Sequence, residues 1–180
     1  MTPVQRLKNI LGGSAGNFVE WFDWFAYSAF AIYFSRAFFP AGDQTAQLLG
    51  AAAIFAVGFI ARPLGALLFG RYADRAGRRA ALTLSVAMMC GGSLMLALIP
   101  TGLGVLSPAL LLVARLLQGL SVGGEYGASA TYISEMAERT QRGFWSGFLY
   151  VTLTGGQLTA LLLLVLLQRV LTEQQLYEWG

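Results

Sequence analysis

Residues 115–135 read RLLQGLSVGGEYGASATYISE and directly follow the apolar run LLLV at 110–113 and Ala114. This stretch carries an arginine, a glutamine and two glutamates, and it contains four glycines. On a soluble helix Arg115 and Glu125 would be ordinary surface charges. Inside a membrane each is costly, and tends to face a water-filled cavity, a partner or a substrate. The composition of the whole chain decides between these two environments.

The composition indicates a membrane protein. Of the 180 residues, 56% are hydrophobic and only 12% are charged, whereas soluble domains carry about 25% charged residues. A helix that crosses the bilayer needs roughly 20 predominantly apolar residues. Five segments meet this requirement, at about 10–35, 45–69, 80–100, 109–134 and 144–168. We therefore expect an all-α membrane protein with five transmembrane helices.

The distribution of Lys and Arg predicts the orientation. Eight of them fall in the N-terminal tail and in the second-to-third and fourth-to-fifth connections, against Arg36 and Arg169 on the opposite side. The positive-inside rule then places the N-terminus in the cytoplasm. Because the basic residues follow the sidedness of the membrane, the pI near 9.3 does not indicate nucleic-acid binding. The first segment is too long, and with Glu20 and Asp23 too polar, for a cleaved signal peptide.

The connection between the second and third helices reads GRYADRAGRRA at 70–80. Gly70 is expected to let the chain leave the helix, and Gly77 to adopt the left-handed conformation of a sharp reversal. Taken singly, the arginines of this loop are explained as positively charged anchors on the cytoplasmic side. The residues of the complete motif are Gly70, Asp74, Arg75, Gly77, Arg78 and Arg79.

The spacing G-x-x-x-D-R-x-G-R-R resembles the cytoplasmic loop motif of the major facilitator superfamily, and it lies between the helices where that family has it. LQGLSVGG at 117–124, with Tyr132, Glu135 and Arg142, resembles the family's sugar-transporter-type signature. The metabolite:proton symporter branch is indicated by GNFVEWFDWFAYS (16–28), FFP (38–40) and GFIARPLG (58–65). Segments 121–135 and 150–164 are most similar to branch members that carry 2-oxoglutarate, and less to those for proline/betaine, citrate or shikimate.

The resemblance implies a secondary active transporter, multi-pass in the cell inner (plasma) membrane, and not an enzyme. It would move a dicarboxylate such as 2-oxoglutarate by proton symport, with no cofactor and no metal. The alternatives are symport of another metabolite, such as proline/betaine, citrate or shikimate, or a truncated fragment that does not transport or serves as an assembly partner.

Full-length members of this superfamily have twelve helices in two bundles, with the substrate held between the bundles. The expectation is therefore an N-terminal transmembrane bundle over 1–180, truncated before a sixth helix, whose partners are the bilayer and a missing C-terminal half. In the family, the loop aspartate, here Asp74, helps to latch the two halves, partly against a helix of the second half.

One face of the fourth helix is polar along its length. At about 100° per residue, six residues fall within an arc of roughly 100°. They are Arg115, Gln118, Val122, Glu125, Tyr126 and Ser129. Beside this face, Gly119, Gly123 and Gly127 form a stripe of small residues that lets helices approach closely. One edge of the helix is therefore expected to pack while the next lines a cavity.

Helix one repeats this pattern, because Glu20, Asp23 and Tyr27 lie within roughly 60° of one another. Helix two adds Arg62, followed by Pro63, whose missing N–H disrupts the helical hydrogen-bond ladder. Three embedded acids thus face two embedded arginines. They would form either a binding cavity with offsetting charges or structural ion pairs between helices without a role in transport.

The chain has no histidine, so a proton carried within these helices must ride on a carboxylate. Desolvation favours the protonated form of a buried carboxyl group, and a neighbouring arginine favours its ionised form. An anionic substrate that occupied the arginine would leave the acid free to hold its proton. The expected substrate-binding residues are Arg115, Arg62, Gln118, Tyr126 and Tyr27. The expected proton-coupling residues are Asp23, Glu125 and Glu20.

Arg115 is the first choice for a carboxylate ligand, with Arg62 assisting, because a guanidinium forms bidentate hydrogen bonds. No catalytic constellation is apparent, since the chain lacks histidine and has a single cysteine. The G-x-S-x-G pattern at 119–123 lies inside a predicted spanning helix with no strand before it, unlike a hydrolase nucleophile elbow.

Overall fold

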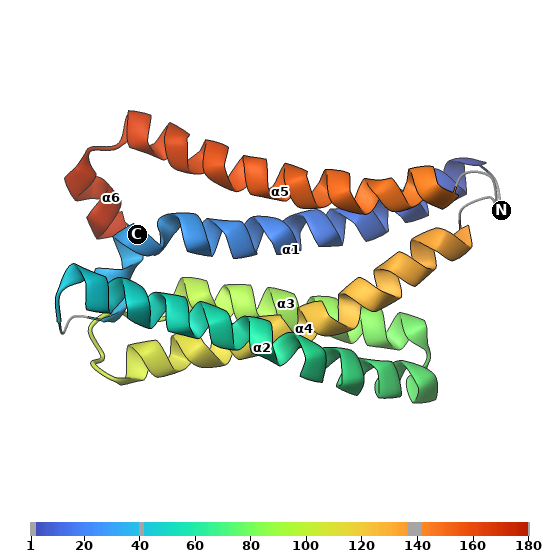
Figure 1. The fold of residues 1–180 in the computed structure, drawn as a ribbon, viewed down its shortest axis with the longest axis horizontal. Helices are drawn as coiled ribbons and strands as arrows, with labels where there is room; N and C mark the ends of the chain where they lie inside the picture. Colours follow the sequence, from blue (N-terminus) through green and yellow to red (C-terminus); the bar gives the residue numbers. More distant parts are fainter. Residues whose placement is uncertain (1–2, 40–41, 137–141, 180) are drawn as a thin grey trace.

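The computed structural model describes residues 3–39, 42–136 and 142–179, with side chains except at 3–13, 79, 126–136, 142, 145, 146, 148 and 179. Within these ranges it consists of helices joined by short connections, without a strand (Figure 1). The helices are α1 (Pro3–Phe38), α2 (Gln44–Ala76), α3 (Arg78–Leu98), α4 (Leu106–Met136), α5 (Arg142–Val170) and α6 (Glu173–Trp179). The predicted all-α class with five long helices is confirmed.

The five long helices run along one common direction and alternate in polarity (Figure 1). The start of α1, the turn from α2 to α3, the end of α4 and the start of α5 therefore gather at one end of the molecule. The connections from α1 to α2, α3 to α4 and α5 to α6 gather at the other end. This alternation is what successive crossings of a bilayer require.

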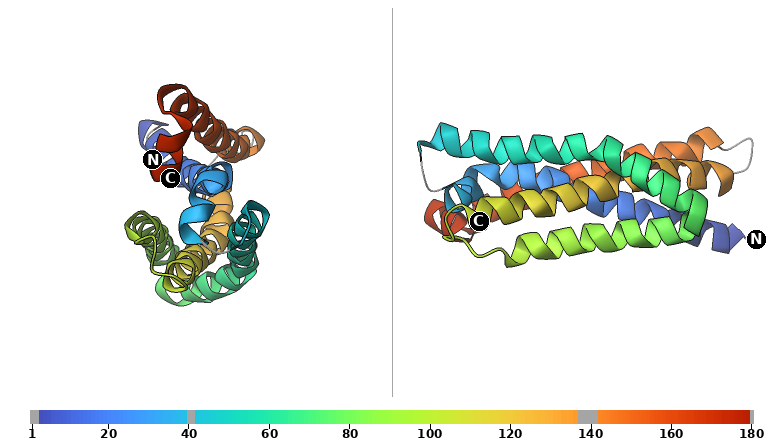
Figure 2. Two further views of the ribbon diagram at one scale, coloured as in Figure 1. Left: turned by 90° about the vertical axis from the view of Figure 1, so that its left-hand side faces the viewer. Right: turned by 90° about the horizontal axis from the view of Figure 1, so that it is seen from below.

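The helices pack in two groups. The most extensive contacts are those of α2 with α4, α1 with α5, and α3 with α4, while α1 contacts α2 and α4 less. Two further views show α4 lying between α2 and α3, with α1 and α5 paired beside them (Figure 2). The boundary between the α1–α5 pair and the α2–α3–α4 group is where the embedded charges meet.

Glycines bring α2 and α4 into direct backbone contact. A Cβ at Gly119 would overlap the carbonyl oxygen of Gly58, and one at Gly123 would overlap that of Arg62. Gly65 of α2 lies equally close to the carbonyl oxygen of Leu120. The close-packing stripe predicted on the fourth helix is thus confirmed at its first two positions, while the surroundings of Gly127 lie outside the described residues.

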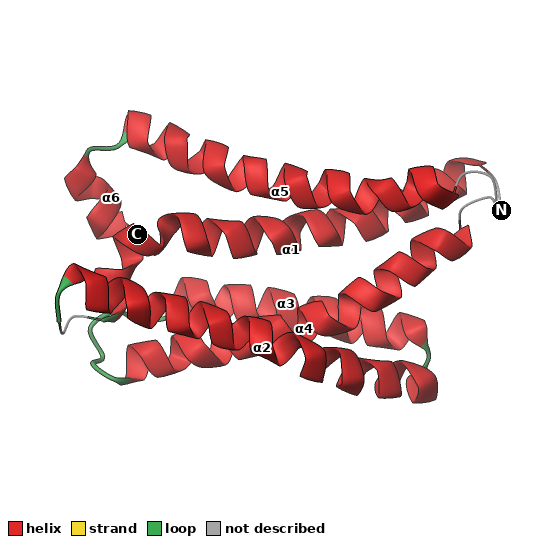
Figure 3. Ribbon diagram, viewed as in Figure 1, coloured by secondary structure: helices red, strands yellow, loops and turns green. Residues whose placement is uncertain are grey.

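The connection from α2 to α3 corrects one expectation. Gly70 does not end the helix, because α2 continues from there to Ala76 through residues that all tolerate helical geometry. The reversal is made by Gly77 alone, with φ 90° and ψ 152°, and its N–H donates to the carbonyl of Ala73. The predicted positive φ at Gly77 is therefore confirmed, although its ψ lies outside the left-handed helical region. The resulting turn is very short (Figure 3).

Four helical segments are long and apolar enough to cross a membrane within the described part of the chain: Gln44–Ala76, Ala80–Leu98, Leu106–Glu125 and Leu149–Val170. The predicted first span, α1, is not among them. Along its described length α1 is more polar, with Ser14, Asn17 and Glu20 buried. Asn17 is held by α5, donating to the carbonyl of Leu149 at 3.1 Å.

After α5 the chain forms α6, a short helix that sequence reasoning did not foresee. It packs back on the end of α1, where the ring of Tyr177 lies 5.3 Å from that of Tyr33 and beneath the guanidinium of Arg36. Leu176 of this helix is buried. This short helix covers the end of the α1–α5 pair opposite to the α2–α3 turn.

Candidate functional site

An ion pair joins α4 to α1 in the middle of the bundle. Nη1 of Arg115 donates to Oδ2 of Asp23 at 2.8 Å. Arg115 is 2% exposed and Asp23 21% exposed, so the arginine is sealed in while its carboxylate partner stays partly accessible. A buried arginine needs such a partner, because an isolated charge is strongly disfavoured away from water.

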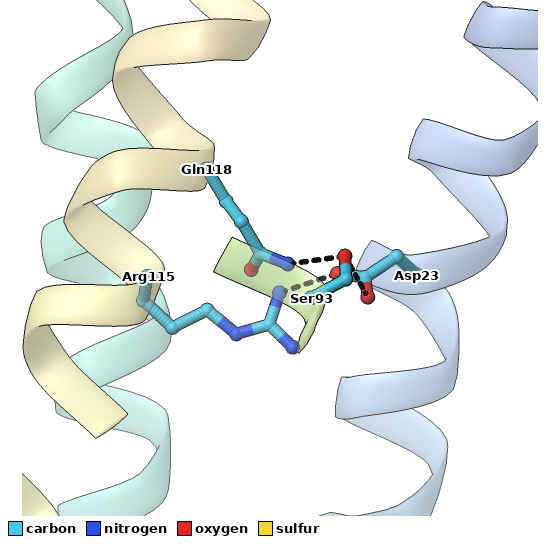
Figure 4. Close-up of polar contacts among 4 residues, drawn as sticks. All are labelled: Asp23, Ser93, Arg115 and Gln118. Carbon is cyan, nitrogen blue, oxygen red and sulfur yellow. Dashed lines mark hydrogen bonds and ion pairs between the residues drawn. The ribbon is translucent and has the colours of Figure 1, made fainter. Parts of the chain in front are cut away.

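Two further polar side chains extend this pair into a network from three helices (Figure 4). Gln118 donates from Nε2 to Oγ of Ser93 at 2.9 Å, and Ser93 donates to Oδ1 of Asp23 at 3.3 Å. Both oxygens of the carboxylate are thus engaged. Nε of Arg115 and Oε1 of Gln118 are buried and have no hydrogen-bond partner among the described residues. The network therefore contains one unused donor, Nε, and one unused acceptor, Oε1.

Tyr27 supports the buried arginine from the side. Its ring centroid lies 4.0 Å from Cζ of Arg115, within the range of a cation–π interaction. Its hydroxyl donates to the backbone carbonyl of Ala51 in α2 at 3.0 Å. Tyr27 therefore acts in this structure as packing and as a link between α1 and α2, with its one donor already in use.

Arg62 occupies a different environment, formed by aromatic rings. Its Cζ lies 3.8 Å from the ring centroid of Phe59, 4.3 Å from that of Trp24 and 5.3 Å from that of Trp21. Nε and Nη2 of Arg62 have no hydrogen-bond partner among the described residues. The guanidinium is thus held by ring faces, which attract the cation without using its N–H donors.

Arg62 lines a cavity of about 560 Å³ between α1, α2, α4 and α5. The wall is otherwise mostly apolar, made of Trp21, Pro63, Ala66, Val122, Gly123 and Leu153. Arg115 lines a separate cavity of about 320 Å³ between α1, α3 and α4. Its wall includes Tyr27, Ser93 and the aromatic rings of Phe30, Phe34 and Phe38. The two embedded arginines therefore face two different spaces.

Two more acids are buried in the bundle, one on α1 and one on α4. Glu20 is 2% exposed and Glu125 is 6% exposed, and the charge of Glu20 interacts with those of Glu125, Arg62 and Asp23. Gly16 of α1 makes room for Glu125, since a Cβ there would stand 2.7 Å from its Oε1. No group of three acids, cysteines or histidines is placed to hold a metal ion within the described ranges.

The structure thus brings most of the predicted residues together: both arginines, all three acids, Gln118 and Tyr27 lie at the contact between α1, α2 and α4. The side chain of Tyr126 lies outside the described residues, as does that of Arg79 in the loop motif. The other motif residues form a separate, exposed group at the end of α2 and the start of α3: Gly70, Asp74, Arg75, Gly77 and Arg78.

Sequence reasoning missed Ser93 and the roles of two aromatic residues. Ser93 lies in an apolar helix without a charged neighbour, so only the packing of α3 on α4 reveals its contact with Asp23. Trp24 is 1% exposed, and its ring centroid lies near both guanidiniums, 4.3 Å from Cζ of Arg62 and 5.3 Å from that of Arg115. The sequence spacing of Trp24, Phe59 and Arg62 does not predict that the two rings surround the guanidinium, because Trp24 lies on another helix.

The family model described as sugar (and other) transporter matches residues 10–179, almost the entire chain. The chain belongs to this family. The predicted membership of the major facilitator superfamily is confirmed. No solved structure is a significant match for this transporter chain.

Curated relatives narrow the resemblance. Alpha-ketoglutarate permease of Escherichia coli (strain K12) is 54% identical over 178 residues, which cover 98% of this chain and 41% of that protein. The citrate-proton symporter of Salmonella typhi is 39% identical over 173 residues, covering 95% and 40%. The proline/betaine transporter of Escherichia coli (strain K12) is 34% identical over 175 residues, covering 96% and 35%. These relatives are named for transport, and the transporter chain spans about two-fifths of their length or less.

Proposed function

We propose that this chain is the N-terminal part of a proton-coupled symporter for a dicarboxylate such as 2-oxoglutarate. The identity with alpha-ketoglutarate permease supports that substrate over citrate or proline/betaine, whose named transporters are less similar. Because the chain spans only 41% of the permease, substrate binding would also need a C-terminal half. The site of the described residues supplies the cationic side of such a binding pocket.

The observation that carries the proposal is the 2.8 Å contact between Arg115 and Asp23. With Asp23 ionised, the buried guanidinium is neutralised and holds no substrate. A proton on Asp23 removes the partner charge, and a substrate carboxylate then takes over the donors of Arg115. Substrate and proton thus occupy the pair together, and losing either one restores the ion pair. Proton and substrate are therefore coupled because Arg115 pairs either with ionised Asp23 or with the substrate carboxylate.

The remaining predicted residues take supporting roles in this proposal. Gln118 holds Asp23 through Ser93. Glu125 and Glu20 are the second position for the proton, since they are buried on facing helices. Tyr126 would extend the binding face of α4, and Tyr27 would set the plane of the Arg115 guanidinium.

The charge distribution of the two ends supports a cytoplasmic N-terminus in a cell inner membrane. The end that holds the α2–α3 turn carries most of the arginines, and the opposite end has Arg36 and Arg169. In a Cys90→Ala background, Asp74→Cys and Leu103→Cys place one thiol at each end. A membrane-impermeant maleimide applied to intact cells is expected to label only Leu103→Cys. Labelling of Asp74→Cys alone would show that the N-terminus lies outside the cytoplasm.

For the loop motif, we propose that Asp74 and its arginines contact the second half of the transporter in one of its conformations. Their exposure supports this role, because none of their described side chains is buried in the chain itself. Asp74→Asn would then change the balance between inward-facing and outward-facing states. It would leave substrate affinity at Arg115 unchanged.

The first experiment is uptake of labelled 2-oxoglutarate into vesicles, comparing this chain with the same chain extended through its downstream reading frame. Uptake that needs the extension and stops when the pH gradient is dissipated would establish the symporter. Uptake by the chain alone would show that the second half is dispensable. If neither form takes up 2-oxoglutarate while the extended form takes up citrate or proline/betaine, the proposed substrate is wrong.

A further inference from the structure

The two embedded arginines differ in how their hydrogen-bond donors are used. Arg115 donates to Asp23 and is almost fully buried. Arg62 makes no hydrogen bond within the described part of the chain, although it is a cation in a helix of a spanning bundle. Three ring faces stabilise its charge instead. The guanidinium plane of Arg62 is therefore held in place, while its N–H donors are not engaged by another described residue.

A guanidinium of this kind is suited to receive a carboxylate. Arg pairs with carboxylates through two parallel hydrogen bonds, and stacking on aromatic rings fixes the plane of the fork beforehand. Less side-chain freedom is then lost when the ligand arrives. The surrounding cavity of about 560 Å³ is large enough for a small metabolite and mostly apolar apart from Arg62. A largely apolar pocket with few placed polar groups is the usual form of a small-molecule site.

Resting on the function proposed above, we propose that Arg62 is the docking group for one carboxylate of the substrate. The substrate enters the larger cavity and binds Arg62 while Arg115 is still paired with Asp23. Arg62 is thus a specificity-determining residue that favours anionic over zwitterionic substrates, and the Arg115–Asp23 pair is the proton-coupling element.

Cysteine protection tests where the substrate docks. Ala66 lines the cavity of Arg62, and Ala97 lines that of Arg115. Each is replaced by cysteine in a Cys90→Ala background, and the rate of reaction with N-ethylmaleimide is measured in vesicles with and without 2-oxoglutarate. We expect 2-oxoglutarate to slow labelling of Ala66→Cys more strongly than labelling of Ala97→Cys. The variants are made in the form extended through the downstream reading frame, because substrate binding needs the C-terminal half.

Adding Arg62→Gln to Ala66→Cys is expected to abolish the protection, and pentanoate, with one carboxylate and the same chain length, is expected to protect less than 2-oxoglutarate. Unslowed labelling of Ala66→Cys, equal protection at both positions, or protection that survives Arg62→Gln would each overturn the assignment. Because the single cysteine variants keep Arg62, a folding defect of the arginine variant does not remove the test.

Transport kinetics give a second readout in the form that takes up 2-oxoglutarate. Arg62→Gln is expected to raise the half-saturating concentration about tenfold or more, as for the loss of a charge-assisted hydrogen bond. The dependence of the remaining uptake on the pH gradient should persist. The matched control is Arg36→Gln, which also removes an arginine from an aromatic ring but at an exposed site outside both cavities. An unchanged half-saturating concentration for Arg62→Gln would overturn the proposal.

The failures are distinguishable. If no form of the chain shows proton-driven uptake, the proposed function fails regardless of Arg62. If uptake is proton-driven but insensitive to Arg62→Gln, the symporter stands and only the docking role is lost.

Discussion

Gly123 of α4 lies directly against the backbone carbonyl of Arg62 in α2, with no room for a Cβ between them. The contact fixes the position of Arg62 along the axis of α4. It therefore also fixes the position of Arg62 relative to Arg115, which lies about two turns from Gly123 on α4. Small residues have this effect in membranes because close backbone approach replaces the hydrophobic drive that water provides elsewhere.

Gly123→Ala is expected to destabilise the bundle, because a methyl group there must push α2 away from α4. Overpacking of this kind costs about 1–3 kcal/mol, so the thermal unfolding temperature in detergent should fall. Gly91→Ala is the matched control, since the space around Gly91 in α3 is open. Equal unfolding temperatures for the two variants would contradict the close packing of α2 and α4.

The α2–α3 turn offers a matched pair within one motif. Gly77→Ala should lower the unfolding temperature, because φ 90° is strained for any residue with a Cβ, at about 1–3 kcal/mol. Gly70→Ala should leave it unchanged or raise it, because Gly70 lies inside α2 with open space around it, and alanine favours a helix by roughly 0.5–1 kcal/mol. The reverse order would show that the helix ends at Gly70 after all.

Asp23→Asn is expected to separate substrate binding from proton coupling. The amide cannot ionise, so exchange of labelled for unlabelled 2-oxoglutarate should continue while uptake driven by a pH gradient is lost. Vesicle assays with and without the gradient measure both. Glu178→Gln, an exposed acid of α6, is the control. Retention of gradient-driven uptake by Asp23→Asn would assign the proton to Glu20 or Glu125 instead.

Arg115→Lys tests the need for a planar fork. Lysine keeps the charge but offers a single ammonium group, which cannot reproduce bidentate binding of a carboxylate. We expect 2-oxoglutarate uptake to be abolished, whereas Arg169→Lys at the exposed end of α5 should transport normally. Normal uptake by Arg115→Lys would rule out the bidentate role.

Tyr27→Phe distinguishes packing from substrate binding. The hydroxyl already donates to Ala51, so its removal should cost about 1 kcal/mol of stability, the net value of one hydrogen bond. The half-saturating concentration of 2-oxoglutarate should stay the same. Tyr150→Phe, at an exposed position of α5, serves as the comparison for stability. A several-fold loss of affinity in Tyr27→Phe would restore Tyr27 as a substrate ligand.

The periodicity of polar residues was enough to predict which faces meet. Arg115, Gln118 and Glu125 were assigned to one side of their helix from spacing, and all three are buried in the bundle. Sequence spacing could not predict how far one helix is shifted along its axis relative to its neighbour. The pairing of Asp23 with Arg115, rather than with Arg62, depends on that shift, and so does the contact of Ser93. The end of α2 was misjudged because glycine permits a turn but does not require one.

The glycine contacts have a mechanical consequence. With α2 and α4 touching backbone to backbone, Arg62 and Arg115 belong to one rigid body, while Glu20 and Asp23 belong to the α1–α5 pair. Any sliding between these two bodies therefore pulls positive from negative charge within a medium of low polarity. Unless a proton or an anion compensates, the electrostatic work resists that movement, and an empty, deprotonated carrier is held still.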